Sequence, residues 1–422
     1  MPRRLWAWCE TTKDHMTRAS GAEIEEFAAA ALAFLEANAR RRPPAESAPW
    51  GAGPDRIGIV ESHASPADEQ RFLREARAWR RRVFDAGFGW VGGPPEYGGG
   101  GRDPILDSVY ESLERGFDVP NQGPFSSATH LIAPSILRFG SHDLKVRYLR
   151  GLFRGDLLAC QLLSEPEAGS DLAALRSTAR RDGREWVVRG QKVWSSYAHV
   201  ADVGQLLVRT DPEAPKHAGL TMFLVEMDRP GIEVRPIRQM TGEAHFNEVF
   251  LDDVHVPNAN RVGEPGEGWR AIMATLASER AAVGSGRPTG ADAFQRLVQL
   301  VRHFGAADRS PVLRDVFADA WIHEQVLRYL ALRYEHRQAS GDEPACEPMI
   351  MKLHFARQAT RIADIAARVL GPALAADTGE WGTFAWTRWV SGAPGLRIAG
   401  GTDEIQRNVL AERVLGLPRS TT

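Results

Sequence analysis

The segment at residues 164–171, with the sequence SEPEAGSD, is the part of the chain whose residue types most clearly suit ligand binding. It follows an apolar run at 157–163, so we expect a buried strand that ends in a tight turn rich in Pro, Gly and Ser. Such a turn presents backbone N–H groups and hydroxyl groups at one point, which suits a carbonyl-rich ring or a phosphate. Trp194 follows about one hairpin later and could lie flat against an aromatic ligand. A surface hairpin with an ordinary buried Trp is the alternative interpretation.

Helices are predicted before this turn. Residues 22–41 and 67–87 carry apolar side chains at helical spacing. The segment 42–65 between them is rich in Pro, Gly and Ser, so we expect a loop with little to pack. Acidic residues flank the run 80–82 (RRR), which favours a solvated helix face over a nucleic-acid patch. Further helices are expected at about 104–116, 124–139 and 143–153.

The pattern changes after residue 157, and three domains are predicted. Short β-branched or aromatic runs separated by turn residues indicate an antiparallel β domain of about 100 residues. Long helical periodicity then returns at 268–285, 291–304, 311–337, 348–371 and 402–415, which indicates a four-helix bundle. We therefore expect an α+β multidomain protein. Its parts are a helical domain at 1–157 with residues 1–20 as a candidate disordered tail, a β domain at 158–265, and a helical bundle at 266–422.

Composition narrows the classes of function. Lys and Arg total 52 and Asp and Glu total 54, so the net charge of −2 favours neither nucleic acid nor an anionic membrane as a partner. Cys9, Cys160 and Cys346 are widely spaced and build neither a disulfide framework nor a metal site, which is typical of a reducing compartment. No apolar run approaches the roughly 20 residues of a membrane span. The basic start is a poor secretory signal, so we expect a cytoplasmic enzyme.

Four ordered segments resemble the acyl-CoA dehydrogenase family. They are SEPEAGSD with GQKVWSS at 164–171 and 190–196, FNEVFLDDVHVP at 246–257, GEGW at 266–269, and GGTDEIQRNVLAERVLGLPR at 400–419. The helical, β, helical order over essentially the whole chain is similar to that family's architecture. The resemblance implies an FAD flavoprotein of fatty acid metabolism that oxidises an acyl-CoA thioester to the trans-2-enoyl product.

The resemblance also implies residues that bind FAD. Contacts of the flavin ring and pyrophosphate are matched by Gln161, Leu163, Ser164 and Ser170, and residues at the ring are matched by Trp194 and Ser196. Positions near the far end of the cofactor are matched by Thr402 and Glu404. A stretch that usually reaches a neighbouring subunit's FAD contains Arg368 and Gly371. The chain departs from the family in Glu167, where Gly or Asn is usual, and in Arg368 and Pro372, where Gln and Gly are commoner.

The reaction needs a carboxylate at the substrate's α-carbon and hydrogen-bond donors on the thioester oxygen. In many family members the carboxylate directly precedes the Gly-Thr of the C-terminal motif, and here that position is Gly400. Isovaleryl- and long-chain-type members instead place the base on an earlier helix before an Arg, which here implies Glu279 followed by Arg280. Arg280, Ser170, Gly400 and Gly401 are then implied to bind substrate. A helix-surface acid is the alternative for Glu279, with Arg280 as its companion.

Other polar residues have structural interpretations. His199 and His245 could be acid–base groups, but a hydrogen-bonded structural histidine is expected at each. Asp403 and Glu404 lie in the first turn of a predicted helix, where an acid stabilises the helix dipole. No metal-ligand spacing or Ser-His-Asp order is evident.

Gly400 leaves space for branched, long or polycyclic acyl groups.

Two alternative functions remain open. One is a flavin oxidase, or a dehydrogenase of an acyl chain bound to a carrier protein. The other is a catalytically silent subunit of a hetero-oligomeric dehydrogenase. By resemblance, the partners would be an acyl-CoA or acyl-carrier-protein substrate and an acceptor of the electron-transfer flavoprotein type. The C-terminal bundle would form a homodimer or homotetramer, with a hetero-oligomer as the alternative.

Overall fold

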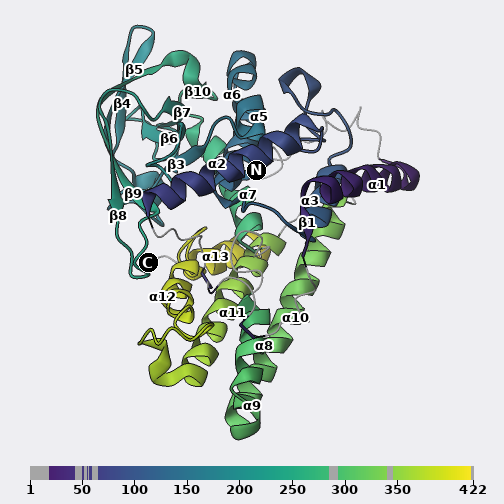
Figure 1. Ribbon diagram of the computed structural model, residues 1–422. Helices are drawn as coiled ribbons and strands as arrows, with labels where there is room; N and C mark the ends of the chain where they lie inside the picture. The colour runs from purple at the N-terminus through teal and green to yellow at the C-terminus, as the bar shows by residue number, and fades with distance from the viewer. Residues whose placement is uncertain are drawn as a thin grey trace.

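The computed structural model describes residues 19–42, 50–51, 55, 57–58, 65–284, 293–339 and 346–419. Figure 1 shows N-terminal helices, a β-sheet beside them, and long helices that extend away from the sheet. The predicted order of helical, β and helical regions is confirmed. The boundaries predicted near residues 157 and 265 fall in the connections that precede the first strand of the large sheet and the first helix of the C-terminal domain.

The N-terminal domain is helical, and its predicted helices are confirmed within a few residues. Ser20, Ser65 and Ser141 each accept a hydrogen bond from the N–H three residues later, which explains where three of these helices begin. The elements are α1 (Gly21–Asn38), β1 (Arg40–Arg41), α2 (Pro66–Asp85), η2 (Pro95–Tyr97), α3 (Ile105–Glu114), β2 (Phe117–Asp118), α4 (Gly123–Ser126), the π-helix η3 (Ser127–Ile132), α5 (Ala133–Phe139) and α6 (His142–Arg154).

The central sheet has the strand order β10-β7-β6-β4-β5-β9-β8, with β3 also paired to β6. The prediction of an antiparallel sheet holds for most pairs, but β3 and β4 each pair with β6 in parallel. The elements are β3 (Ala159–Leu162), η4 (Leu172–Ala174), β4 (Thr178–Asp182), β5 (Glu185–Lys192), β6 (Val203–Arg209), β7 (Leu220–Glu226), β8 (Ile232–Ile237), β9 (Phe246–Pro257), η5 (Asn258–Asn260) and β10 (Arg261–Val262).

The C-terminal domain is a bundle in which α11 packs against α7, α8 and α10. Helix α12, which the sequence analysis missed, adds the buried rings of Trp386 and Trp389 to the core of this bundle. The elements are α7 (Gly268–Gly284), α8 (Ala293–His303), α9 (Ala306–Arg309), α10 (Pro311–Ala339), α11 (Glu347–Leu370), η6 (Gly371–Leu374), α12 (Trp386–Leu396), α13 (Asp403–Val409) and the π-helix η7 (Leu410–Val414).

The segment 42–65 packs more than the sequence suggested. The ring of Trp50 stacks on His303 at the end of α8, with ring centroids 4.3 Å apart. It also meets the edge of Trp381 at 5.0 Å. Ile57 is buried in the core of the C-terminal bundle. The predicted loop with little to pack is therefore wrong at these described residues, because aromatic and aliphatic side chains anchor the segment to the other end of the molecule.

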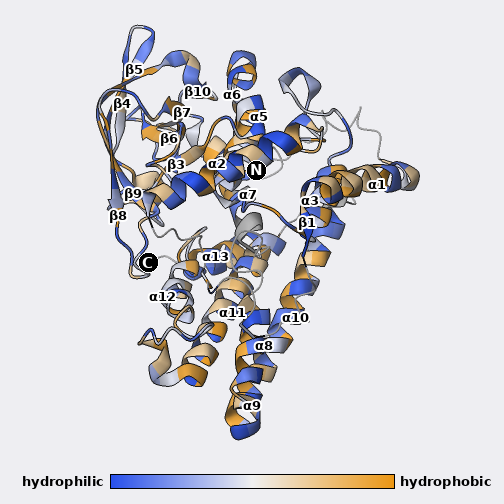
Figure 2. Ribbon diagram, viewed as in Figure 1, coloured by the Kyte–Doolittle hydropathy of each residue, from blue (hydrophilic) through white to orange (hydrophobic). Residues whose placement is uncertain are grey.

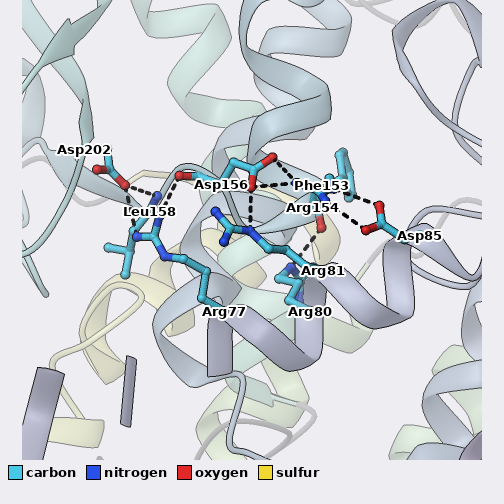
Figure 3. A network of polar contacts seen from close by, with 9 residues as sticks. All are labelled: Arg77, Arg80, Arg81, Asp85, Phe153, Arg154, Asp156, Leu158 and Asp202. Carbon is cyan, nitrogen blue, oxygen red and sulfur yellow. Dashed lines mark hydrogen bonds and ion pairs between the residues drawn. The ribbon is translucent and has the colours of Figure 1, made fainter. Parts of the chain in front are cut away.

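Arginines of α2 tie the N-terminal helices to the sheet (Figure 3). Arg77 donates to the backbone carbonyl of Asp156 at 2.6 Å and to the carboxylate of Asp202 at 3.3 Å. Arg81 donates to the carboxylate of Asp156 at 2.7 Å. The Asp202 carboxylate also accepts from the backbone N–H of Leu158 at 2.7 Å. Because Asp156 and Asp202 lie just before β3 and β6, these contacts hold the starts of two adjacent strands.

Arg80 on α2 contacts the end of α6 in the same domain, so the predicted solvated face is wrong for Arg80, while Arg81 stays exposed. Arg80 donates to the carbonyl of Phe153 at the end of α6, at 3.0 Å. Burial lowers the pKa of the Arg80 guanidinium to about 10. Arg82 is exposed. Asp85, an acidic residue that flanks this run, pairs with Arg154 at 2.8 Å and so joins α2 to the end of α6.

Replacing Asp202 with Ala should destabilise the contact between α2 and the starts of β3 and β6. The buried N–H of Leu158 loses its acceptor, and Arg77 loses one of two acceptors. We expect the free energy of unfolding to fall by about 1–2 kcal/mol, measured by urea unfolding. Asp228→Ala, in the exposed turn after β7, is the matched control and should change it by less than about 0.5 kcal/mol. Equal effects of the two substitutions would contradict a stabilising role of the Asp202 contacts with Arg77 and Leu158.

Candidate active site

The strand and turn predicted around residue 164 are present. Strand β3 ends at Leu162, and the turn is closed by reciprocal backbone hydrogen bonds between Glu165 and Ala168. Gln161 lies opposite Gln205 of β6. Its side-chain Nε2 is buried and finds no hydrogen-bond partner among the described residues, which is unusual unless a ligand supplies an acceptor.

Trp194 lies beside this turn in a strained backbone conformation. The N–H of Val193 donates to the carbonyl of Ser164 at 2.9 Å, so the two predicted segments are brought together. Trp194 has a φ of 63° and Tyr197 a φ of 58°, both in the left-handed region that non-glycine residues rarely adopt. The Trp194 side chain is 57% exposed, and its ring meets the edge of Phe246 at 5.8 Å. The alternative of an ordinary buried Trp is therefore wrong.

Asn247 of β9 holds the strained segment in place. Its side-chain Nδ2 donates to the carbonyls of Ser195 and His245 at 2.9 and 3.1 Å, and its backbone carbonyl accepts from the Ser195 N–H at 3.1 Å. The N–H of Tyr197 donates to the carbonyl of His245 at 2.9 Å. Left-handed residues persist where surrounding contacts over-determine them, and such strain concentrates at ligand sites.

The two histidines have structural partners, as expected from the sequence. His199 Nε2 lies 3.0 Å from the Glu69 carboxylate of α2, a further contact between the sheet and the N-terminal helices. His245 Nδ1 lies 3.0 Å from the amide of Gln239. Burial, assisted by His199, lowers the pKa of the His245 imidazole to about 4, so this ring is neutral at pH 7.

The loop before α13 contains two consecutive left-handed glycines, Gly400 with a φ of 67° and Gly401 with a φ of 90°. Gln406 Nε2 donates to the carbonyl of Gly400 at 2.8 Å. A Cβ on Gly401 would lie 2.6 Å from that same nitrogen, so a side chain there would displace the contact. Thr402 caps α13 by accepting from the N–H of Ile405 at 3.2 Å. The structure thus gives Thr402 a structural role next to its implied cofactor role.

Asp403 has a buried ionic role that the sequence analysis missed. Its carboxylate accepts from Lys352 Nζ at 3.2 Å and from Arg397 Nε at 2.9 Å, and Lys352 also donates to the carbonyl of Arg397 at 3.1 Å. Burial alone would raise the pKa of the Asp403 carboxyl, but Arg397 and Lys352 outweigh burial and hold the pKa below its ordinary value. A lysine within the apolar stripe of helix 348–371 was the signal that could have indicated this pair.

The other candidates lie in separate parts of the structure. Glu279 is half-buried on α7, which packs against α11, β7 and η3. The side chain of Arg280 lies outside the described residues. Arg368 pairs with Asp364 at 2.8 Å at the end of α11, and Gly371 follows that helix, so both are placed by helices of the bundle and not by the sheet. Their implied roles, and that of Glu279, stay predictions.

The remaining implied residues differ in exposure. Leu163 is buried, Ser164, Ser196, Gly400 and Gly401 are half-buried, and Ser170 and Glu404 are exposed. Glu404 lies 3.6 Å from Arg407. The unusual Glu167 forms an exposed ion pair with Arg176 at 2.8 Å, which neutralises the charge that this departure adds. Such a pair contributes little stability.

The residues present fit a flat, carbonyl-rich cofactor such as FAD. The buried amide of Gln161 has a donor to offer, Trp194 presents a strained and exposed ring, and Ser164 and Ser196 add hydroxyls on the two joined segments. The described residues contain no group of three or more side chains placed to ligate a metal ion. No helix formed by the described residues has the length and apolar character to cross a bilayer.

Replacing Asp403 with Asn should remove a pH-dependent contribution to stability. Since the folded pKa lies below the unfolded value of about 3.9, this contribution is fully present above that pH and is lost as the pH falls through the folded pKa. We expect Asp403→Asn to lower the free energy of unfolding by about 3 kcal/mol at pH 7, and less below pH 4. Urea unfolding across this range measures it. Glu404→Gln, at the exposed neighbouring residue, should keep the wild-type profile; a constant deficit in Asp403→Asn would contradict the assignment.

All three domains of the chain are similar to domains of known proteins. Models of the N-terminal, middle and C-terminal domains of acyl-CoA dehydrogenases match residues 59–156, 160–254 and 266–415. The acyl-CoA dehydrogenase IpdE1 of Mycobacterium tuberculosis strain H37Rv is 38% identical over 370 residues, which cover 86% of this chain and 93% of that protein. The name of this relative specifies neither an isovaleryl nor a long-chain type, so the subtype that the base position suggested stays a prediction.

Two solved structures share the fold. A steroid acyl-CoA dehydrogenase, Tcur3481-Tcur3483, is 26% identical with a TM-score of 0.72, covering 96% of this chain and 100% of that one. The ChsE4-ChsE5 complex from Mycobacterium tuberculosis is 26% identical with a TM-score of 0.70 and the same coverage. The sequence match over all three domains, the match to IpdE1 and the shared fold lead to one conclusion: this chain belongs to the acyl-CoA dehydrogenase family.

Proposed function

We propose that the chain binds FAD and takes part in the α,β-dehydrogenation of an acyl-CoA thioester to the trans-2-enoyl product, with Glu279 as the base. The observation that carries the proposal is the junction of the two cofactor segments, where Val193 donates to Ser164 beside the exposed, left-handed Trp194. A backbone held under strain to expose a large aromatic ring is expected where a ligand covers that ring.

Each candidate residue has a distinct task in this proposal. Gln161, Ser164 and Ser196 donate hydrogen bonds to the cofactor, and Trp194 packs against it. FAD, when bound, supplies the acceptor for the hydride that leaves the β-carbon. Glu279 takes the α-proton, for which its half-buried position on α7 is suitable because partial desolvation makes a carboxylate more basic.

The thioester oxygen needs donors while charge develops on it. Gln406 holds the Gly400 carbonyl, and since a trans peptide is planar, the N–H of Gly401 points to the opposite side of that peptide. No acceptor for this N–H lies among the described residues. We assign the N–H groups of the loop at Gly400 and Gly401 to the thioester oxygen.

A bulky acyl group is the substrate class that we favour. Gly400 places no side chain where many family members have the base, and the solved structure with the higher of the two TM-scores is titled a steroid acyl-CoA dehydrogenase. A polycyclic acyl-CoA uses the space that a side chain at residue 400 would fill.

Replacing Glu279 with Gln should lower the rate of dehydrogenation about 1,000-fold, because the amide cannot accept the α-proton. The variant should keep its bound FAD and the yellow colour. Anaerobic bleaching of the flavin by acyl-CoA measures both properties. Glu233→Gln, which alters a surface ion pair on β8, is the control and should keep the wild-type rate. Undiminished turnover of Glu279→Gln would exclude Glu279 as the base.

A second candidate function is that of one subunit in a two-component dehydrogenase. The two similar structures are titled Tcur3481-Tcur3483 and the ChsE4-ChsE5 complex, so each title joins two protein names. In this chain α10 exposes Trp321, Ile322, Tyr329 and Leu332, and Figure 2 shows apolar residues along this helix. Apolar side chains gathered on one helix are typical of a subunit interface.

Substrate and subunit composition can be tested together. The purified chain should be yellow and should bleach anaerobically faster with a steroid acyl-CoA than with a straight-chain acyl-CoA. Bleaching that appears only after a second chain is added would favour the two-component enzyme. Faster bleaching by the straight-chain substrate would contradict the bulky acyl group. Rapid reaction of the reduced flavin with oxygen would identify an oxidase.

A further inference from the structure

A buried ion pair lies directly behind the candidate cofactor segments. The side chain of Lys192, the last residue of β5, is 0% exposed, and that of Glu165 in the turn is 8% exposed. Lys192 Nζ lies 2.8 Å from Glu165 Oε1. None of the proposed catalytic steps uses either charge, so the pair needs another explanation.

The pair is fully connected by hydrogen bonds. Lys192 Nζ also donates to the backbone carbonyl of Leu163 at 3.1 Å. The Glu165 carboxylate accepts from the backbone N–H groups of Arg176 and Ser177 at 2.6 and 2.9 Å. The pair therefore links the end of β5, the turn and the start of β4.

Burial makes this arrangement costly, which argues for a specific role. Burial lowers the pKa of the Lys192 ammonium to about 8, despite the opposing effect of Glu165. Burial alone would raise the pKa of the Glu165 carboxyl, but Lys192 outweighs it and the pKa stays below its ordinary value. Both groups are thus mainly charged at pH 7, and an apolar pair of similar volume would often be as stable.

The contact with Leu163 fixes the direction of one peptide group. Because the peptide between Leu163 and Ser164 is planar and trans, its N–H points away from the carbonyl that Lys192 holds. The Ser164 N–H is accordingly directed away from the buried ammonium, and no acceptor for it lies among the described residues. The Ser164 carbonyl accepts from Val193, the residue between Lys192 and Trp194. Lys192 therefore holds the peptide group before Ser164 directly, and the adjacent residue Val193 holds the peptide group after Ser164.

We propose that Lys192 is a positioning residue of the cofactor site: by holding the Leu163 carbonyl it directs the Ser164 N–H toward FAD, and Glu165 neutralises the charge that this requires. This inference rests on the proposed binding of FAD. Lys192 acts on the cofactor through the backbone at Ser164, whereas Glu165 acts through the charge of Lys192.

Three variants distinguish positioning from general stabilisation. Lys192→Met removes the donor to Leu163 and leaves Glu165 charged. Glu165→Gln leaves that donor in place. The double variant Lys192→Met/Glu165→Gln removes both charges, so the fold regains stability, yet the Leu163 carbonyl still lacks its donor. The dissociation constant for FAD is measured on the apoprotein by fluorescence, together with the melting temperature of the apoprotein and the visible spectrum at saturating FAD.

We expect Lys192→Met and the double variant to raise the FAD dissociation constant at least about tenfold, as the loss of one well-placed hydrogen bond predicts, and to shift the flavin spectrum. Glu165→Gln should stay within about threefold of wild type. The double variant should melt at a higher temperature than Lys192→Met.

Recovery of wild-type FAD affinity in the double variant would show that the pair only stabilises the fold, and would overturn the proposal. So would a loss of affinity in Glu165→Gln equal to that in Lys192→Met, because that variant keeps the donor to Leu163. The affinity of the wild-type chain for FAD tests the proposed function separately from these variants. A wild-type chain that binds no FAD, alone or with a copurified partner subunit, would overturn the proposed function itself.

Discussion

A single backbone hydrogen bond, from the N–H of Val193 to the carbonyl of Ser164, joins the two segments on which the candidate site depends. One segment follows β3 and the other follows β5, and these strands are not neighbours in the sheet. Lys192 fixes the carbonyl before Ser164, and Asn247 fixes the backbone after Trp194. The site is therefore held from behind by buried polar groups, while the ring of Trp194 stays exposed in front.

Charged side chains recur at contacts between separate parts of the chain, from the exposed Asp202 to the buried Asp403. Asp202 and Asp156 hold α2 to the starts of two strands, and Lys352 with Asp403 holds the glycine loop against α11. Each of these contacts combines an ion pair with a backbone carbonyl or N–H. Ionic contacts of this kind add little net stability, but they specify geometry because a lone buried charge is costly.

The sequence predicted the features that depend on local pattern. The order of domains, most helix limits, and the turn before Ser170 follow from periodicity and turn residues, and the resemblance supplied the roles of Trp194 and Glu279. Contacts between distant residues were not accessible. Lys352 and Asp403 are 51 positions apart, and nothing in the pattern around Asp403 indicates a buried partner. Arg368 and Gly371 are implied to reach a neighbouring subunit, so one chain cannot place their ligand.

The packing of Trp50 and Ile57 makes the C-terminal core discontinuous in sequence. Ile57 is buried with helices that begin more than 200 positions later, and Trp50 covers Gly382, where a Cβ would approach its ring to 2.7 Å. A fragment that starts at α7 would expose the apolar surface that these two residues cover. The cooperative folding unit therefore includes Trp50 and Ile57 together with the C-terminal helices, and it is larger than the C-terminal domain alone.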